Sequence, residues 1–270
     1  MRAFLCHKNA IVSGYVMAIT VTLNIESTMK TALSLLATML VATLTSASAV
    51  ATQCNLNSQY LKADYTITNT HKNKQNSQVL TLWRNNQQVA HQNDVTTELW
   101  QHLANKQIRP IRYFNAQQRG IEYQPSEVRG VQNWSAKNQL VDNHLIKKMT
   151  LTKTQGTGCD EVKNYTYQEG ENTYTLAFYS QTQLVKSFSV NNTKNQTITL
   201  LSLNNVSYNK QQITSQFAQW DRFQTTDYAD IGDNENDPFL AKMINLGFIE
   251  HGATGFYNQQ GEAIQGGHHH

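Results

Sequence analysis

The stretch that decides the fold is residues 78–91, which read QVLTLWRNNQQVAH. Residues 78–84 and 87–91 are rich in the aliphatic and aromatic side chains that favour β-strands. Between them, Asn85 and Asn86 tolerate the left-handed backbone that a tight hairpin turn requires. This stretch therefore predicts two antiparallel strands joined by a short turn.

The same pattern extends through most of the chain. Residues 61–68 alternate apolar and polar side chains, with Leu61, Ala63 and Tyr65 on one side, as in a half-buried strand. Segments of this kind, regularly spaced and separated by Asn-rich turns, are typical of an antiparallel meander. Further strands are expected at residues 96–103, 107–114, 118–124, 150–154, 161–168, 174–179, 183–190, 196–203 and 206–212.

A helix is predicted to interrupt the strands at residues 136–149, because Ser135 is a good N-cap and apolar residues then recur at helical spacing. The chain is expected to become helical again at residues 214–223. We therefore predict a mainly β (α+β) fold. The strands are expected to form an antiparallel meander, for which an incomplete barrel is one possible arrangement. The fold also contains one embedded helix and a short helical C-terminal segment.

The C-terminal segment contains the clearest local signal in the chain. Asp237 is a good cap, Pro238 suits the first helical position, and Gly247 is the expected left-handed stop after a helix at residues 239–246. The predicted β domain covers residues 50–213. Residues 214–270 are interpreted as a helical and loop appendage of the same domain.

Uncharged polar residues dominate the composition. Asn and Gln together account for 54 of the 270 residues, whereas charged residues make up only 15%, compared with about 25% in an average soluble domain. A net charge of +3 and only 3 prolines exclude disorder driven by charge repulsion. The absence of a basic run gives nucleic acid no electrostatic footprint.

The N-terminal region reads as a secretory signal at residues 29–49. It has a positively charged start, Met29-Lys30, an apolar run at residues 33–44 and the small-residue cleavage pattern Ala-Ser-Ala at residues 47–49. Residues 1–28 are interpreted as an over-extended gene start, with an uncleaved anchor as the alternative. Cleavage is expected to leave a soluble periplasmic chain without a stable transmembrane segment.

Two cysteines remain after the predicted cleavage, Cys54 and Cys159. In an exported chain they are expected to form a disulfide, because the compartment is oxidising. The closed loop of about 100 residues would stabilise the fold by at most about 4–5 kcal/mol in the chain-entropy model. The alternative is two unpaired thiols. The absence of a C-x-x-C pair removes support for a redox enzyme.

An acidic segment offers a candidate cation site. Residues 227–237, DYADIGDNEND, contain five carboxylates, and calcium prefers such oxygen ligands. Neither starting position tested gives the spacing of an EF-hand, and the alternative is a solvated acidic loop in which Asp237 caps a helix. The three terminal histidines, residues 268–270, add nitrogen donors. The candidate ligands of a divalent cation are Asp227, Asp230, Asp233, Glu235 and His251.

Motifs for nucleophilic or zinc-dependent catalysis are absent from the sequence. It contains no G-x-S-x-G, no H-E-x-x-H, and no S-x-x-K followed by K-T-G. The histidines His71, His91, His102 and His144 are scattered without a spaced partner. No catalytic residue is therefore assigned, and an exported hydrolase with an unrecognised site is kept only as a second alternative.

A basic and aromatic strip is a further candidate site. Such a strip could hold an anionic headgroup or a sugar, and the alternative is an ordinary polar outer face. If residues 115–117 close a hairpin, Arg109 and Arg119 lie on neighbouring strands. The side chain of Arg112 then points to the opposite face of the sheet from that of Arg109. The strip consists of Arg109, Arg112, Arg119, Arg129, Tyr113, Tyr123 and Trp134.

Two stretches resemble strand pairs of the periplasmic lipoprotein-carrier half-barrels. They are residues 80–91 (LTLWRNNQQVAH) and 174–190 (YTLAFYSQTQLVKSFSV). Each stretch consists of an aromatic and aliphatic strand, a polar turn and a second strand, and both strands would belong to one concave sheet. Proteins of that family are incomplete β-barrels that hold acyl chains against a helical lid.

The resemblance implies an exported, non-catalytic binding or carrier protein for an apolar or lipid-like ligand. A metal-binding or metal-responsive protein is the first alternative. The alternative for the aromatic residues is that they are simply the core of a filled sheet-and-helix domain. The candidate ligand-binding residues are Leu80, Leu82, Trp83, Trp100, Phe178 and Phe188, together with Arg112 and Arg119 from the basic strip.

Overall fold

The protein is described by a computed structural model, in which all the described residues belong to one compact unit. The predicted extension at residues 1–28 and the predicted signal at residues 29–49 lie outside the described residues. None of the described helices combines the length and apolarity needed to cross a bilayer. The described residues are 54–72, 74–127, 133–232 and 236–248, with the paired two-residue strands β13 (Phe256–Tyr257) and β14 (Ala263–Ile264).

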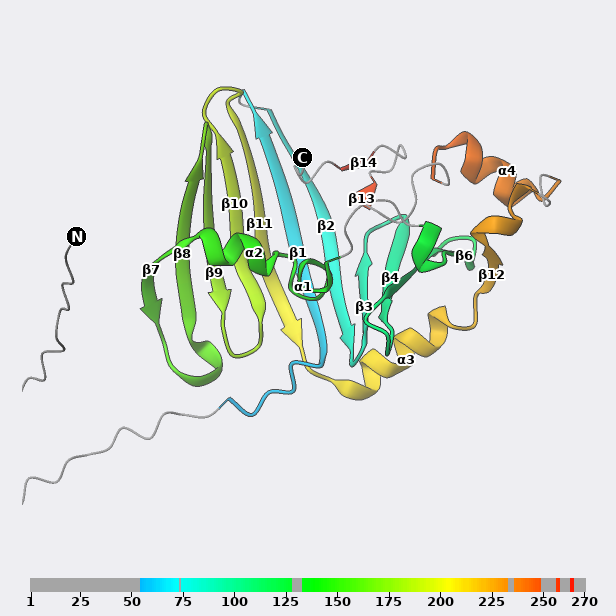
Figure 1. The fold of residues 1–270 in the computed structure, drawn as a ribbon, viewed down its shortest axis with the longest axis horizontal. Coiled ribbons are helices and arrows are strands. Elements are labelled where there is room, and N and C mark those ends of the chain that lie inside the picture. Colours follow the sequence, from blue (N-terminus) through cyan, green and yellow to red (C-terminus); the bar gives the residue numbers. More distant parts are fainter. Residues whose placement is uncertain are drawn as a thin grey trace, which may run out of the picture. The chain divides into compact units, whose positions relative to one another are not determined.

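Within the described residues, twelve strands form one sheet, in the spatial order β12-β6-β5-β4-β3-β2-β1-β11-β10-β9-β8-β7 (Figure 1). Neighbouring strands are antiparallel, except that β12 runs parallel to β6. The strands are β1 (Tyr60–His71), β2 (Lys74–Asn85), β3 (Gln88–Gln92), β4 (Thr96–His102), β5 (Ile108–Phe114), β6 (Arg119–Glu122), β7 (Thr150–Gln155), β8 (Val162–Glu169), β9 (Asn172–Tyr179), β10 (Leu184–Asn192), β11 (Thr197–Ser207) and β12 (Gln224–Asp227).

The described sheet is open, because its two edge strands, β12 and β7, do not pair with each other. Its central join is the pairing of β1 with β11, which brings together residues far apart in sequence such as Ile67 and Leu201. On either side of this join, consecutive strands follow one another as hairpins. The predicted fold class, a mainly β antiparallel meander in the form of an incomplete barrel, is therefore confirmed.

The predicted turn between β2 and β3 is present but lies one residue further along the chain. Asn85 ends β2 and pairs with Gln88, so the two turn residues are Asn86 and Gln87. Asn86 lies between β2 and β3 with φ of 59°, in the left-handed region that Asn tolerates. The β5–β6 hairpin closes similarly around Gln118, with φ of 51°. Both short turns force the following strand to pair antiparallel with the preceding one.

The sheet has two faces, which we name after the helices that cover them. The α1 face includes the buried residues Leu61, Ala63 and Tyr65 of β1 and packs against α1 (Trp134–Gln139) and α2 (Asn143–Lys148). In Figure 1 these two helices lie across β1, β11, β10 and β9.

The opposite face, the α3 face, packs against α3 (Lys210–Trp220). Ile213, Phe217 and Trp220 of this helix contact Trp83, Ala90, Leu99, Ile111 and Tyr113 of the sheet. The strands between β2 and β5 are therefore covered on both faces.

The predicted embedded helix differs from the structure. Instead of one helix at residues 136–149, the chain forms α1 and α2. Leu140 has φ of 63° and ends α1, and the carboxylate of Asp142 then accepts the backbone N–H of His144 to start α2. The N-cap of α1 is Asn133, whose side chain accepts the backbone N–H of Ser135. Two strong caps within nine residues thus divide a helical pattern.

The beginning of α3 also differs from the prediction. A strand was expected to continue to residue 212, but β11 ends at Ser207. Asn209 accepts the backbone N–H of Gln212, and this capping bond starts α3 four residues before the predicted start at residue 214.

The C-terminal helix α4 (Pro238–Asn245) is confirmed, with its cap and its stop. Asp237 accepts the backbone N–H of Phe239, and Gly247 has φ of 73°. The backbone N–H of Phe248 donates to the carbonyl of Met243 at 3.0 Å. Leu240, Met243 and Phe248 pack against the sheet. Their partners there are Phe114 of β5, Ile121 of β6 and Tyr123, which directly follows β6.

The predicted disulfide between Cys54 and Cys159 is present, with the two Cα atoms 4.6 Å apart. Cys159 lies in η2 (Gly158–Asp160). Two further single-turn helices, η1 (Pro125–Glu127) and η3 (Tyr228–Asp230), occupy connections.

Candidate ligand-binding face

A row of apolar side chains crosses the α1 face at right angles to the strands. Residues directly opposite each other on neighbouring antiparallel strands share a face, and the register aligns one such residue on each of six strands. With strands about 4.8 Å apart, the line is about 24 Å long. We call it the apolar row: Ile67, Leu201, Phe188, Leu176, Tyr165 and Leu151.

Buried and half-buried side chains alternate along the apolar row, which ends at an exposed one. Leu201 and Leu176 are buried, whereas Leu151 on the edge strand β7 is 50% exposed. Phe188 is half-buried, and Tyr174 stacks on it at a centroid distance of 6.4 Å. This part of the sheet therefore presents half-buried aromatic rings beside a closed core.

Helix α2 covers this surface mainly through apolar contacts. Leu145 and Ile146 pack against the core of the α1 face. Among the described residues, α2 makes one polar contact with the sheet, the ion pair of Lys148 with Glu169 at 4.0 Å, whose side chains are 60% and 59% exposed. An exposed pair of this kind contributes about 0–1 kcal/mol. Separation of α2 from the sheet thus breaks little hydrogen bonding.

Helix α1 is anchored differently, by two buried polar side chains of the sheet. The Nε of Arg84 donates to the carbonyl of Asn138 at 2.6 Å. The Nε2 of His91 lies 2.7 Å from the carbonyl of Lys137. Burial lowers the pKa of His91 to about 3, so its ring is neutral and its Nε2 carries the proton that faces this oxygen. The left-handed Leu140 separates this anchored helix from α2.

Most of the predicted ligand-binding residues meet on the α1 face. Leu80, Leu82, Trp100 and Phe178 are buried there in one core, with Phe188 at its border. Trp83 lies on the α3 face, where its ring meets Trp220 edge-on at 5.7 Å. The pleat explains the separation, because Trp83 directly follows Leu82 in β2. The binding role of all six residues stays a prediction.

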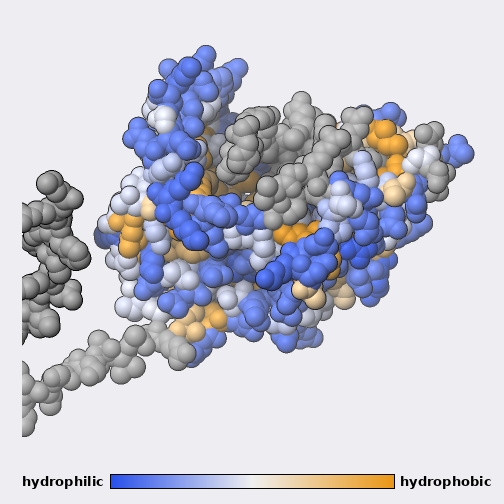
Figure 2. Space-filling view, in the orientation of Figure 1, coloured by the Kyte–Doolittle hydropathy of each residue, from blue (hydrophilic) through white to orange (hydrophobic). Residues whose placement is uncertain are grey.

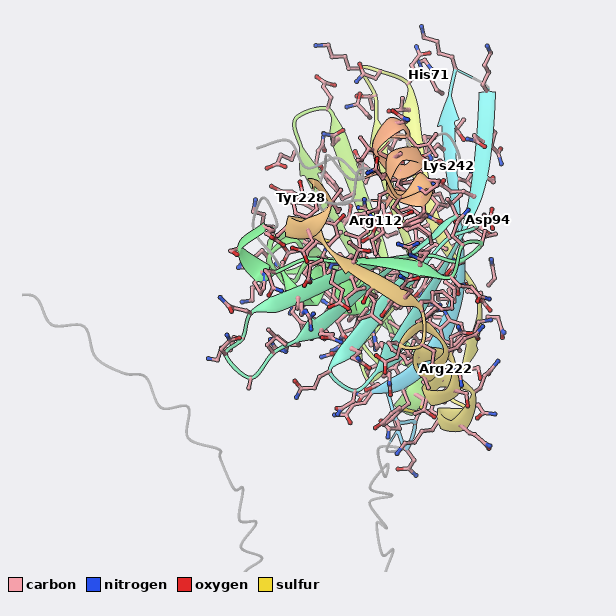
Figure 3. The ribbon with its side chains drawn as sticks, turned by 90° about the vertical axis from the view of Figure 1, so that its right-hand side faces the viewer. His71, Asp94, Arg112, Arg222, Tyr228 and Lys242 are labelled. Atoms are coloured by element: carbon pink, nitrogen blue, oxygen red, sulfur yellow. A yellow bond between two sulfur atoms is a disulfide. The ribbon has the colours of Figure 1, made fainter. Side chains whose placement is uncertain are left out.

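The arginines of the predicted strip do not gather on one surface. Arg112 lies in the interior (Figure 3) and donates to Glu98 and to the carbonyl of Phe248. Arg119 pairs with Asp237 at 2.8 Å, and Arg109 pairs with Glu122 on the α3 face. Each of these three cations has a carboxylate partner. Arg129 lies outside the described residues, and the binding role of Arg112 and Arg119 stays a prediction.

The candidate metal ligands are only partly described. Asp227 ends β12 and Asp230 ends η3, both exposed. Asp233, Glu235, His251 and the histidines at residues 268–270 lie outside the described residues. Among the residues that are described, no group of three His, Cys, Asp or Glu side chains could hold a metal ion. The cation site therefore stays a prediction.

Sequence reasoning missed most of the apolar row. The alternation at residues 61–68 places Ile67 on the same face as Leu61, so one signal was available. Leu201, Leu176 and Tyr165 become neighbours only through the register of β11, β9 and β8. Seen from the side drawn in Figure 2, the surface is mostly hydrophilic, with apolar residues in small separate areas.

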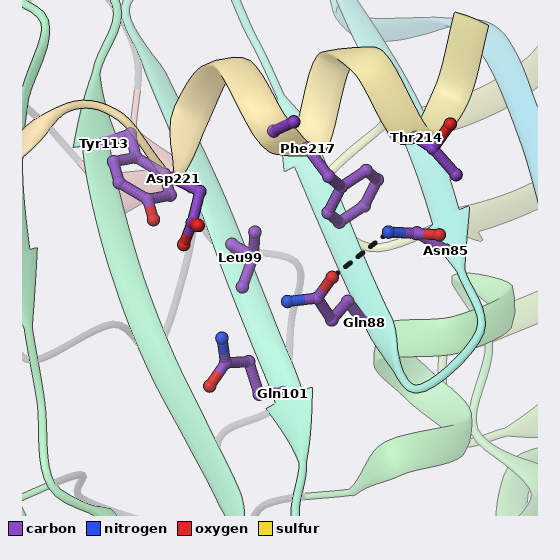
Figure 4. Close-up of a pocket in the computed structure, with 9 residues that line it drawn as sticks. Asn85, Gln88, Leu99, Gln101, Tyr113, Thr214, Phe217 and Asp221 are labelled. Carbon is purple, nitrogen blue, oxygen red and sulfur yellow. Dashed lines mark hydrogen bonds between the residues drawn. The ribbon is translucent and has the colours of Figure 1, made fainter. Parts of the chain in front are cut away.

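A cavity of about 230 Å³ lies on the α3 face beside α3 (Figure 4). A hollow of about 550 Å³ lies at the end of the β1–β2 hairpin, lined by residues such as Thr70, Gln75 and Ile198. The interior of the α1 face is closely filled by its own side chains, as in the packed-core alternative.

No protein-family model and no curated protein matches the sequence. Solved structures that the fold is similar to include PNGF-II, with a TM-score of 0.37 and 11% identity over 62% of this chain. The matched part spans only 31% of PNGF-II.

Two smaller proteins are also similar. A DUF1329 family protein from Desulfovibrio piger matches with a TM-score of 0.30, 9% identity, 56% of this chain and 86% of its own. An outer membrane lipoprotein-sorting protein domain from Vibrio parahaemolyticus matches with a TM-score of 0.30, 7% identity, 60% of this chain and 92% of its own. The latter belongs to the class that residues 80–91 and 174–190 resemble, and the likeness is weak.

Proposed function

We propose that this protein is an exported, non-catalytic binding protein for an apolar or lipid-like ligand, which lies along the apolar row beneath α2. The observation that carries the proposal is the row itself, a line of apolar side chains about 24 Å long. Along it, buried Leu201 and Leu176 alternate with half-buried neighbours, and the line ends at exposed Leu151. A chain-like apolar ligand matches this length and direction. Burying its surface and that of the half-buried rings supplies about 25 cal/mol per Å².

The two lid helices differ in a way that suits entry of such a ligand. Arg84 and His91 hold α1 on the sheet, whereas α2 rests on Leu145 and Ile146.

Moving α2 away from the sheet would break the two hydrogen bonds that join Asn143 to Gln139 and Ser135 of α1. It would also bend the chain where Met149 connects α2 to β7. The bound ligand would replace the apolar contacts that α2 loses and would offset part of this cost.

Export rests on two features of the chain. The signal pattern at residues 29–49 is one, and the disulfide between Cys54 and Cys159 is the other. Disulfides persist in oxidising compartments such as the bacterial periplasm. Both features favour a periplasmic ligand.

The test is titration with a fluorescent fatty acid, with native mass spectrometry of the purified protein to detect co-purified lipid. We expect micromolar binding by the protein. The double substitution Tyr165→Ala/Phe188→Ala should weaken it by about tenfold or more, since each buried aromatic side chain contributes about 1.5–3 kcal/mol.

The matched control is Val79→Ala/Leu200→Ala, which removes exposed apolar side chains from the opposite side of the sheet. Val79 and Leu200 are 52% and 36% exposed, and Leu200 directly precedes Leu201 of the row. This variant should bind like the unmodified protein. Ligand-free protein that ignores the probe, or equal weakening by both variants, would contradict the proposal.

A further inference from the structure

A cavity of about 230 Å³ opens on the α3 face, between α3 and the sheet (Figure 4). It lies on the side of the sheet opposite to the apolar row. Its lining comes from the consecutive elements β2–β3 hairpin, β4 and β5, and from α3, which is distant from them in sequence. The lining residues are Asn85, Gln88, Leu99, Gln101, Tyr113, Thr214, Phe217, Ala218 and Asp221.

The space follows from the packing of α3. The large side chains of α3, Ile213, Phe217 and Trp220, fill the interface with the sheet. Beside Phe217, the residues of α3 that line the cavity, Thr214 and Ala218, are small. The helix is therefore supported by its aromatic contacts while a volume much larger than one water molecule remains open beside it.

The polar groups around this cavity retain hydrogen-bonding capacity. Figure 4 shows the ends of Asp221, Gln101 and Gln88 directed towards a common space around Leu99. Gln88 accepts one hydrogen bond from Asn85 at 3.2 Å, which leaves its own amide N–H groups available. In the part of the chain that the structure describes, neither Gln101 nor Asp221 has a recorded side-chain hydrogen bond, and Asp221 is exposed.

Tyr113 adds a hydroxyl that stays protonated at neutral pH. Burial raises its pKa to about 12, and the nearby carboxylates of Asp221 and Glu122 act in the same direction. The hydroxyl can therefore donate. Together with amide N–H and C=O groups and one carboxylate, the lining offers both donors and acceptors.

We propose that this cavity binds a small neutral polyhydroxylated molecule of the monosaccharide class. Each hydroxyl of such a ligand both donates and accepts, which matches the mixed amide, carboxylate and phenol lining. The apolar sides of Leu99 and Phe217 suit the C–H surface of a sugar ring. The binding of this ligand does not depend on the proposed function of the α1 face.

Two other ligand classes fit the lining less well. An anion would face the carboxylate of Asp221 without a cationic lining residue to neutralise it. An organic amine would pair with Asp221, but its ammonium group only donates and offers no acceptor to the N–H groups of Gln88 or the hydroxyl of Tyr113. The cavity lining offers both hydrogen-bond donors and acceptors, and among the three ligand classes only a polyol matches both.

The experiment is saturation-transfer difference NMR with calorimetry, using glucose, galactose, mannose and N-acetylglucosamine as probes. We expect at least one to bind with a dissociation constant on the order of 1 mM, as suits a ligand of this size. Gln101→Leu should weaken binding between about three- and tenfold by removing a hydrogen-bonding side chain.

Ala218→Phe should abolish binding by filling the cavity. Its matched control is Ser215→Phe, which places the same ring at an exposed position of α3 that does not line the cavity. Binding of the fluorescent fatty acid should be the same in both variants, which separates this site from the α1 face.

The proposal is overturned if none of the four sugars gives a signal at 50 mM, a level about fifty times the expected dissociation constant. It is also overturned if Ala218→Phe and Ser215→Phe bind sugar equally. Binding of a simple amine such as methylammonium in preference to every sugar would assign the cavity to a cation instead.

Discussion

At the scale of single residues, Arg84 is a buried cation whose hydrogen-bond partners are backbone carbonyls. Besides Asn138, it donates to Ser58 at 3.3 Å, to Thr182 at 2.8 Å and to Gln183. Burial lowers its pKa to about 10, so the guanidinium is charged at pH 7. One side chain thereby ties α1, the segment before β1 and the β9–β10 turn to β2.

Replacing Arg84 with Met is expected to lower the free energy of unfolding by about 3–5 kcal/mol. Met fills a similar volume but leaves several buried carbonyls without a donor, and each such group costs about 1–3 kcal/mol. Urea denaturation followed by circular dichroism measures the change. The matched control is Arg222→Met at the surface (Figure 3), which should change stability by less than about 0.5 kcal/mol. Similar losses in both variants would show that the carbonyl contacts contribute little.

A second residue-scale prediction compares two glycines with the same backbone conformation. Gly156 and Gly170 have φ of 76° and 56°. A Cβ at Gly156 would lie 2.4 Å from the carbonyl oxygen of Asp160, whereas a Cβ at Gly170 meets nothing within 4 Å. Both alanine variants incur the left-handed penalty of about 1–2 kcal/mol, and Gly156→Ala adds the clash.

Gly156→Ala should therefore unfold at a lower urea concentration than Gly170→Ala. The difference between them isolates the steric term, because the backbone penalty is common to both. Equal midpoints would mean that the turn relaxes enough to admit a methyl group.

At the scale of elements, α4 is attached to the sheet by an ion pair as well as by its apolar face. Asp237 caps the helix and also accepts from Arg119 of β6. The hydrogen bond from Arg119, and then the one from the backbone of Phe239, hold the pKa of Asp237 below its ordinary value of 3.8. The stability that this carboxylate contributes is therefore complete above pH 3.8 and is lost as pH falls through its folded pKa.

Asp237→Asn tests this charge while keeping the cap, since Asn is as good an N-cap as Asp. The variant should be less stable than the unmodified protein at pH 7, and the difference should shrink as pH falls below about 4. Thermal unfolding at a series of pH values measures it. A difference that stays constant down to about pH 2 would indicate that the charge of Asp237 plays no part.

Local signals predicted α4 well and the embedded helix less well. Asp237, Pro238 and Gly247 each act on the backbone within one turn, so their effect can be read from sequence. In residues 136–149 the helical spacing of apolar residues was correct, but Asp142 is a second cap inside it. Spacing alone does not show that a second cap divides one helical pattern into two helices.

At the scale of the whole molecule, the hairpins could be predicted and their assembly could not. A turn with a left-handed residue such as Asn86 fixes the pairing of β2 with β3 locally. The pairing of β1 with β11, and the parallel addition of β12 to β6, depend on side chains that meet only after collapse. The apolar row exists because of that non-local register, which explains why only Phe188 of its six members was proposed from sequence.

The disulfide is the whole-molecule feature that sequence did predict, and it carries the last prediction. Cys54 and Cys159 are 105 residues apart, and closing a loop of this length stabilises the fold by about 4–5 kcal/mol in the chain-entropy model. The double variant Cys54→Ser/Cys159→Ser should lose up to this amount in urea denaturation. Dithiothreitol should destabilise the unmodified protein and leave the double variant unchanged.

Because Cys54 lies at the start of the described chain and its bond joins no part of α2, fatty-acid binding at low temperature should survive in the double variant. Loss of both stability and binding would instead make the disulfide part of the binding face.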